Sequence, residues 1–525
     1  MKLCPECRKN YIDESLNFCL DDGSSLISVS PPEEPVTAIL AGQSGYDTPP
    51  SNLPAESTPG NSIAVLPFVN MSADVDNEYF CDGLAEELLN ALAKIDDLKV
   101  AARTASFSFR GKNQSMAEIG RSLNVKSILE GSVRKAGNRV RITVQLINAA
   151  DGCHLWSERY DRDMEDIFEV QDEITLAVVE ALKVKLLAPE KQAMLKRHTN
   201  DAEAYQLYLR GRYFFYKRTP EGFLKAIECF EKAIELDADY ALAISGLADS
   251  HVFLGFYEMV PPAEAAVKLR PLVERAIEID EDSSETNTSR ALLKTLYEWK
   301  HRDSLKYFEA AVVADPRYAL AYHLKSAVSV ILGEHEDAIA AEQKAIEIDP
   351  FTPVFNASLA WWYYIAGQNE HAMAQSHKTI EIAPNHFFAH WVRGLTLAGQ
   401  GAYSDAIVSL QEAVSLNQFD PHVRGDLGRV LAMAGEREEA IGILDDFRTK
   451  AATQYISPVN LAKVHVGLSD YEEALDQLEN AFAERAVKLP WFIVDPCLKP
   501  LRSNPRFSDL VVRLGLPQSS RTVNV

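Results

Sequence analysis

Small residues recur in the second half of the chain at a fixed interval of 34 residues. Glycine and alanine each hold one phase of this period over four copies, and proline holds a third phase over three copies: Gly333, Gly367, Gly401 and Gly435; Ala338, Ala372, Ala406 and Ala440; Pro316, Pro350 and Pro384. This spacing is typical of a repeat array, in which each unit stacks on its neighbours because it cannot bury its own apolar face. Such an array forms an extended curved surface, so the sequence favours binding over catalysis.

Each unit is predicted to be a helix-turn-helix. In the copy at 319–352, Gly333 ends the first helix because glycine accepts left-handed torsion angles. Asp349-Pro350 ends the second helix, since proline cannot continue a helix and restricts the residue before it. Alanines such as Ala338 and Ala345 allow the two helices to approach closely.

This punctuation by glycine, alanine and proline resembles the tetratricopeptide repeat, with Gln418 replacing the expected proline in one copy. The resemblance, together with degenerate flanking copies such as AIECFEKAIELDADY (226–240), implies a helical solenoid of about eight units over residues 201–490. Residues 491–525 break the period and are expected to form a C-terminal cap and tail, because the end of an array must cover its last apolar face.

The N-terminal segment 1–27 carries the pair Cys4 and Cys7, followed by Cys19 and Asp22. A C-x₂-C pair places two thiolates on one turn, where a single tetrahedral zinc ion can take both. The segment resembles a zinc ribbon, except that Asp22 stands where the family has a cysteine. We expect one structural zinc ion held by these four residues, because so short a segment has too little core to fold unaided. A degenerate ribbon that binds no metal is the alternative.

The linker 28–61 is rich in Pro, Ser, Gly and Glu and is predicted to be disordered. Residues 62–187 then alternate apolar strands with amphipathic helices, which predicts an α/β domain with a mixed sheet. The expected strands are 62–68, 98–103, 126–133, the strand after the turn Ala136-Gly137-Asn138, and 153–160; the expected helices are 76–95, 115–124 and 164–186.

Motifs of this domain, IAVLPFVNMSADVDNEYFCDGLAEELLNALAKI and SILEGSVRKAGNRVRITVQLINAADGCHLWSERYDRDMEDIF among them, resemble the TolB amino-terminal-like domain. In bacteria that domain commonly precedes tetratricopeptide repeats and follows a variable output or sensor module. The resemblance implies no catalytic residues. The expected fold class is therefore multidomain: a small zinc ribbon, a mixed-sheet α/β domain and an all-α tetratricopeptide solenoid.

The formal net charge of −23 disfavours bulk binding to nucleic acid or to an anionic membrane. No apolar run is long enough for a membrane helix, the N-terminus has no secretory signal, and seven cysteines in 525 residues indicate a reducing compartment. A cytoplasmic protein is expected.

Catalytic motifs are missing from the sequence. Phe109-Arg110-Gly111-Lys112 lacks the earlier glycine and the final Ser/Thr of a phosphate loop, and neither G-x-S-x-G nor G-x-G-x-x-G occurs. Arg134, Arg139 and Arg141 form either a solvated strand face or, less favoured, a site for an anion. The chain is expected not to be an enzyme.

The remaining candidate site follows from the repeat phase, because one face of each first helix lines the groove in the tetratricopeptide fold. Aromatic residues on that face are favoured as binding anchors. The predicted groove residues are Leu320, His323, Trp361, Tyr364, Phe388, Trp391, Leu395 and Arg429. For each of them, packing between helices is the equal alternative. We therefore expect a scaffold or adaptor that captures protein or peptide partners. The second hypothesis is a regulatory protein whose α/β domain senses a small anion or nucleotide.

Overall fold

The computed structural model describes residues 61–112, 114–195, 197–418 and 420–517, together with three short strands near the N-terminus. The chain divides into two units, 1–57 and 58–525. In the first unit, β1 (Lys2–Leu3) pairs antiparallel with both β2 (Asn10–Tyr11) and β3 (Ile27–Ser28). The predicted zinc ligands Cys4, Cys7, Cys19 and Asp22 lie outside the described residues, as does most of the predicted linker.

The second unit begins with the predicted mixed sheet. Its strands are β4 (Ser62–Val65), β5 (Val69–Asn70), β6 (Lys99–Val100), β7 (Ser127–Ala136), β8 (Arg139–Asn148) and β9 (His154–Asp163). The order is β6-β4-β7-β8-β9, with β5 also beside β7. Pairs along β4 and β5 are parallel, whereas β7, β8 and β9 form an antiparallel meander.

Alternate residues of β4 face two different cores, as expected for a strand buried on both sides. Ile63 and Val65 pack with helices α1 (Glu78–Leu92) and α4 (Ile167–Ala181), while Ala64 and Leu66 pack with α2 (Arg103–Phe107) and α3 (Met116–Leu123). Two 3₁₀ turns, η1 (Val75–Asn77) and η2 (Met164–Asp166), precede α1 and α4. Strand β5 and helix α2 were not predicted from the sequence.

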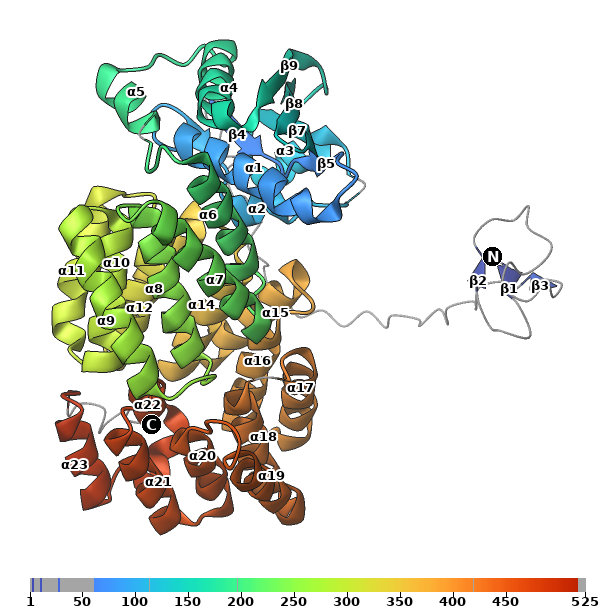
Figure 1. The fold of residues 1–525 in the computed structure, drawn as a ribbon. Coiled ribbons are helices and arrows are strands. Elements are labelled where there is room, and N and C mark those ends of the chain that lie inside the picture. The colour runs from blue at the N-terminus through green and yellow to red at the C-terminus, as the bar shows by residue number, and fades with distance from the viewer. Residues whose placement is uncertain are drawn as a thin grey trace. The chain divides into compact units, whose positions relative to one another are not determined.

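The rest of the unit is helical, and eight antiparallel helix pairs run from α6 to α21 (Figure 1). The helices are α5 (Ala188–Met194), α6 (Ala202–Phe215), α7 (Pro220–Leu236), α8 (Ala241–Phe256), α9 (Pro262–Ile279), α10 (Ser284–Leu292) with a π-helical turn η3 (Leu293–Glu298), α11 (His301–Ala314), α12 (Ala319–Ile331), α13 (His335–Ile348), α14 (Pro353–Ile365), α15 (Asn369–Ile382), α16 (Phe387–Gly399), α17 (Tyr403–Leu416), α18 (Pro421–Ala434), α19 (Arg437–Lys450), α20 (Pro458–Leu468), α21 (Tyr471–Ala483), α22 (Leu489–Val494), the 3₁₀ turn η4 (Pro496–Leu501) and α23 (Pro505–Arg513).

The periodic glycines stop the first helices as predicted. Gly333, Gly367, Gly401 and Gly435 all have left-handed φ angles, between 75° and 94°. A side chain with a Cβ is strained in this region, so glycine is favoured there. Among the described residues, no helix combines the length and apolar character needed to cross a bilayer.

The α/β domain and the first repeats share one hydrophobic core. Buried residues of α1 and α4 form a single cluster with those of α6, α7 and α8. A second contact joins the domain to the middle of the array, where Arg317 donates to the carbonyl oxygens of Leu98 (3.1 Å) and Ile95 (3.3 Å). The domain is therefore docked on the array at two places that are far apart in the sequence.

Candidate interaction face of the repeat array

The first helices α12, α14, α16 and α18 lie side by side and form one continuous face of the array, here called the first-helix face. All eight predicted groove residues are on these four helices. The face has two parts that differ in exposure. Leu320, His323, Trp361 and Phe388 are half-buried, whereas Tyr364, Trp391, Leu395 and Arg429 are buried.

Aromatic rings connect neighbouring repeats on the half-buried part. The Trp361 ring centroid lies 5.8 Å from that of Phe388 and 5.1 Å from that of Trp391. Phe388 and Trp391 are 5.4 Å apart on α16. The structure thus brings the two tryptophans together, while their role as groove anchors stays a prediction. Aromatic pairs at these distances and tilts stabilise the packing of neighbouring helices.

His323 is held by a buried carboxylate. Its Nδ1 lies 2.9 Å from Oε1 of Glu342, which is fully buried between α12 and α13. Glu342 also accepts hydrogen bonds from the Ser326 hydroxyl and, at 3.1 Å, from Nε1 of Trp362. Three donors therefore satisfy one buried carboxylate, an arrangement that makes its burial tolerable and fixes the His323 ring.

The buried part of the face has polar partners within the chain. The Tyr364 hydroxyl donates to Asp495 Oδ1 (3.0 Å), and Trp391 Nε1 donates to Asp426 Oδ2 (2.9 Å). Arg429 is within 3.1 Å of Asp426 Oδ1. In this conformation these side chains contact the protein itself, and any role in partner binding remains a prediction.

A C-terminal segment packs against the first-helix face. It consists of α22 and η4, residues 489–501, and buries its large apolar side chains in the same core as α12, α14, α16 and α18. Trp491 Nε1 donates to the Ala327 carbonyl on α12 (3.0 Å), 164 positions away. The Trp491 ring also lies 6.3 Å from Phe256 at the end of α8.

The segment 491–525, expected to form a cap, therefore makes two different sets of contacts. The final helix α23 does cover the last repeat, because Arg506 pairs with Glu472, Asp476 and Glu479 of α21. Residues 489–501 instead reach back to repeats in the middle of the array. This long-range contact could not be predicted from the repeat period, which describes contacts only between neighbouring repeats.

The burial of its apolar side chains indicates whether the C-terminal segment is part of the folded core or is bound loosely like a peptide. Six of its side chains, Leu489, Trp491, Phe492, Ile493, Leu498 and Leu501, are at most 7% exposed. Burial of such a side chain contributes roughly 1.5–3 kcal/mol, so the set contributes on the order of 10 kcal/mol before entropy is subtracted. We conclude that the segment is part of the folded core.

Buried ion pairs join repeats next to the C-terminal segment, and Lys488, the residue before it, takes part in two of them. Lys463 on α20, only 1% exposed, lies 2.6 Å from Asp426 Oδ2 on α18. Lys488 lies 3.2 Å from Asp420 Oδ1 and 3.9 Å from Glu258, just beyond α8. Burial opposes ionisation of Lys488, but the carboxylates of Asp420 and Glu258 raise its pKa above the usual value.

The junction between the α/β domain and α6 is also polar. Glu86 of α1 accepts from Arg103 Nε (2.8 Å), from Arg212 Nη2 on α6 (2.7 Å) and from the Tyr216 hydroxyl (3.1 Å). Burial disfavours the carboxylate, yet the two guanidinium groups lower the pKa of Glu86 below its usual value. This network holds the first repeat against the sheet domain.

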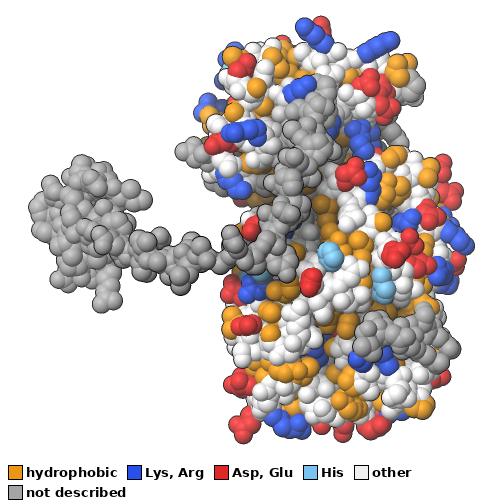
Figure 2. Space-filling view, turned by 180° about the vertical axis from the view of Figure 1, so that it is seen from behind, with side chains coloured by type: hydrophobic (Ala, Val, Ile, Leu, Met, Phe, Trp, Pro, Cys, Tyr) orange, Lys and Arg blue, Asp and Glu red, His pale blue; other side chains and the backbone are white. Residues whose placement is uncertain are grey.

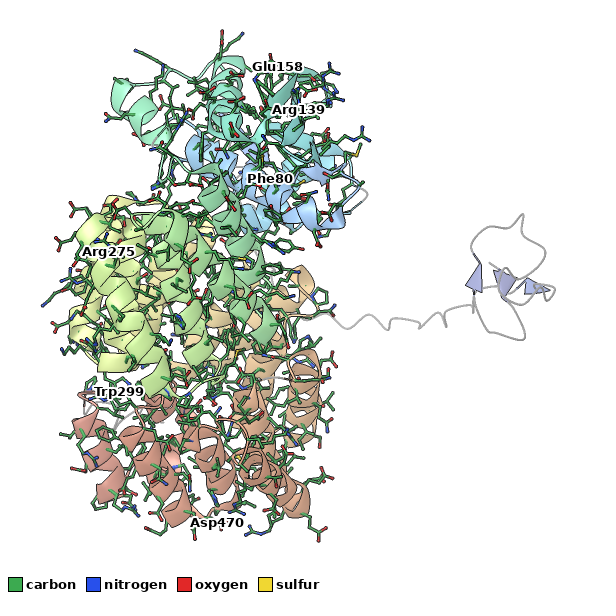
Figure 3. The ribbon with its side chains drawn as sticks, viewed as in Figure 1. Phe80, Arg139, Glu158, Arg275, Trp299 and Asp470 are labelled. Carbon is green, nitrogen blue, oxygen red and sulfur yellow. The ribbon has the colours of Figure 1, made fainter. Side chains whose placement is uncertain are left out.

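The arginines considered for an anion site have partners of their own. Arg139 and Arg141 on β8 lie 2.7 and 2.6 Å from the carboxylate of Asp161 on β9, and Arg134 donates to the Met71 carbonyl (3.3 Å). Hydrogen bonds from Arg139 and Arg141 lower the pKa of Asp161 to about 2. Arg139 lies at the start of β8 (Figure 3), between β7 and β9, and the carboxylates of Asp161 and Asp163 balance its charge. Figure 2 likewise shows acidic and basic side chains interspersed over the face that it presents.

Family models match two parts of the chain. A model described as the second domain of HilA/YgeH-like transcriptional regulators matches residues 59–177, and tetratricopeptide-repeat models match residues 223–240 and 299–353. The predicted repeats are thus confirmed. The resemblance of the α/β domain to the TolB amino-terminal-like domain stays a prediction.

One similar curated protein is the "Putative adenylate cyclase 3" of Rhizobium meliloti (strain 1021), 44% identical over 200 residues. This match covers 38% of the chain and 33% of the relative, so the chain spans about a third of that protein.

Solved structures with similarity include TTC0263, described as a thermophilic TPR protein of Thermus thermophilus (18% identity, 37% of this chain and 99% of that one, TM-score 0.32). Others are MamA (22%, 32% and 93%, TM-score 0.24) and YrrB, "a TPR protein with an unusual peptide-binding site" (18%, 39% and 97%, TM-score 0.26). By family model and by helix pairing, this chain carries a tetratricopeptide array behind a mixed-sheet domain.

Proposed function

We propose that the chain is a non-enzymatic adaptor that binds a protein or peptide partner on the part of the first-helix face left open by its C-terminal segment. Tetratricopeptide repeats generally mediate protein–protein interactions. The observation that supports this location is the half-buried group Leu320, His323, Trp361 and Phe388, which presents aromatic surface on three consecutive first helices. Rigid aromatic side chains of this kind are common binding anchors.

The fixed His323 ring supports the same proposal. Because Glu342 and its other two donors hold the ring, its binding surface needs little ordering when a partner arrives. Preorganised side chains lose less conformational entropy on binding, which favours affinity. We place this adaptor in the cytoplasm, with protein rather than nucleic acid as its partner, in keeping with the net charge of −23.

A second candidate function is regulatory. The core shared by α1, α4 and α6–α8 would relay a change in the α/β domain to the repeats. A family model named for HilA/YgeH-like transcriptional regulators and a relative named a putative adenylate cyclase favour this candidate. The balanced arginines on β8 give an anion sensor no support, so this candidate needs a ligand site elsewhere in the domain.

Partner capture by matched variants tests the adaptor. Phe388→Ala removes a half-buried ring from the open part of the face, whereas Val313→Ala removes a side chain that is 81% exposed on α11, a second helix of its repeat. Proteins captured from lysate by the wild-type chain should be lost with Phe388→Ala and kept with Val313→Ala, at similar melting temperatures. Equal capture by all three chains would contradict the assignment of this face.

A further inference from the structure

A small cavity lies where the α/β domain meets the first repeat. Its volume is about 70 Å³, and its walls come from α1, α4, the segment after α5, α6 and the start of α8. The lining includes Glu87, Phe168, Asp172, Tyr205 and Tyr240. A water molecule occupies roughly 30 Å³ in the liquid, so the cavity has room for only a few heavy atoms.

Glu87 is the one charged side chain in this lining that has no counter-ion or hydrogen-bond donor among the described residues. Asp172 pairs with Arg197 (2.9 Å). The nearest guanidinium from α6, Arg212, is engaged by Glu86 and Tyr216. The cavity therefore carries one uncompensated carboxylate.

Three hydroxyl groups of the wall are also engaged by the protein. The Tyr205 hydroxyl is bonded to the Gln171 amide, the Thr175 hydroxyl donates to the Gln171 carbonyl (2.7 Å), and the Thr199 hydroxyl donates to Asp237 (2.6 Å). Burial and the neighbouring Glu86 raise the pKa of Glu87 to about 7. The Arg212 charge lowers this pKa in part, and a positive group inside the cavity would favour the ionised form further.

We propose that this cavity binds a small organic cation, a primary ammonium group on a short apolar chain. The ammonium would pair with the Glu87 carboxylate beside the rings of Tyr205 and Tyr240, as aromatic faces attract cations. The Phe168 ring already has the Arg197 guanidinium over it, 5.5 Å from the ring centroid. Leu88, Ala91 and Leu242 provide the apolar wall for the methylene groups. An anion is disfavoured because it would face the uncompensated carboxylate.

The cavity is separate from the proposed partner site, which lies on α12, α14 and α16 of the first-helix face. Its walls belong to both the sheet domain and the first repeat, so an occupant stabilises their junction. Binding to the native state raises the free energy of unfolding in proportion to the logarithm of ligand concentration. The melting temperature of the full chain therefore reports occupancy directly.

The test uses the full chain with n-propylamine and n-butylamine, and with propionate, inorganic phosphate and potassium chloride as comparison ligands. The amines should raise the melting temperature, and calorimetry should give a binding constant weakened at least tenfold by Glu87→Gln. Glu169→Gln, which removes a carboxylate on α4 outside the cavity, should bind as the wild type does.

Ala91→Leu supplies a second variant, because it fills the cavity while Glu87 stays in place. It should abolish the amine effect even if Glu87→Gln proves unstable. The proposal is overturned by any of three results: no amine shift, an equal shift with potassium chloride, or undiminished amine binding by both cavity variants.

Discussion

Trp491→Ala tests whether the C-terminal segment belongs to the folded core. Trp491 is 7% exposed, touches the Phe256 ring at the end of α8, and donates to the Ala327 carbonyl on α12. The substitution removes a large buried ring and one hydrogen bond from the C-terminal segment to α12. Replacing a core tryptophan by alanine costs ~3–5 kcal/mol, and we expect a loss of this size in the free energy of unfolding.

The assay is urea unfolding of the full chain, followed by circular dichroism. The control is Val512→Ala on α23, at a side chain 52% exposed, which should change stability by less than about 0.5 kcal/mol. If residues 489–501 only capped the last repeat, Trp491→Ala would add an early transition for α21–α23 and leave the main transition in place. That result would refute the reasoning, because the contact with α12 would then contribute nothing.

Three further predictions test other parts of the chain. Metal analysis of the purified chain should find about one zinc ion, lost in Cys7→Ser; a zinc-free wild-type chain would refute the proposed ribbon. Glu86→Ala should lower the free energy of unfolding by about 2–3 kcal/mol, because it leaves two partly exposed guanidinium groups unpaired at the junction. Urea unfolding measures this loss, and an unchanged midpoint would contradict it. Burial raises the pKa of Asp249 from 3.8 to about 6, so the folded state holds the Asp249 proton more tightly than the unfolded state does. The stability that this proton contributes is lost as the pH rises from about 4 to about 6. Asp249→Asn should therefore gain stability relative to wild type between pH 4 and pH 7, and a constant difference across that range would be inconsistent with the shift.

Local features of the array could be predicted from the sequence because each has a local cause. Gly333 was expected to end a helix, and α12 ends at Ile331 with Gly333 at a φ of 75°. Asp349-Pro350 was expected to end the next helix, and α13 ends at Ile348. Short elements were less accessible: β4 ends at Val65 rather than residue 68, and β5 was not anticipated because two residues carry no periodic signal.

The contacts between the end of the chain and the earlier repeats could not be predicted, because they depend on the superhelical path of the array. Lys463 stands in an apolar stretch and gives no sign that it meets Asp426, 37 positions earlier. Trp299 likewise follows a π-helical turn and packs against Phe482 of α21, with ring centroids 5.3 Å apart, at the boundary visible in Figure 3. The predicted groove residues lie on first helices of the array, and one of them, Tyr364, has its hydrogen-bond partner Asp495 in the C-terminal segment.

Hydrogen exchange across residues 489–501 in the intact chain shows whether the C-terminal segment belongs to the folded core. If the C-terminal segment is part of the core, its amides should exchange as slowly as those of α14 and α18, which share its hydrophobic core, because all of them open only when this part of the array unfolds. Exchange of residues 489–501 near the rate of an unstructured chain, with α14 and α18 still protected, would show that the segment detaches and would contradict the account.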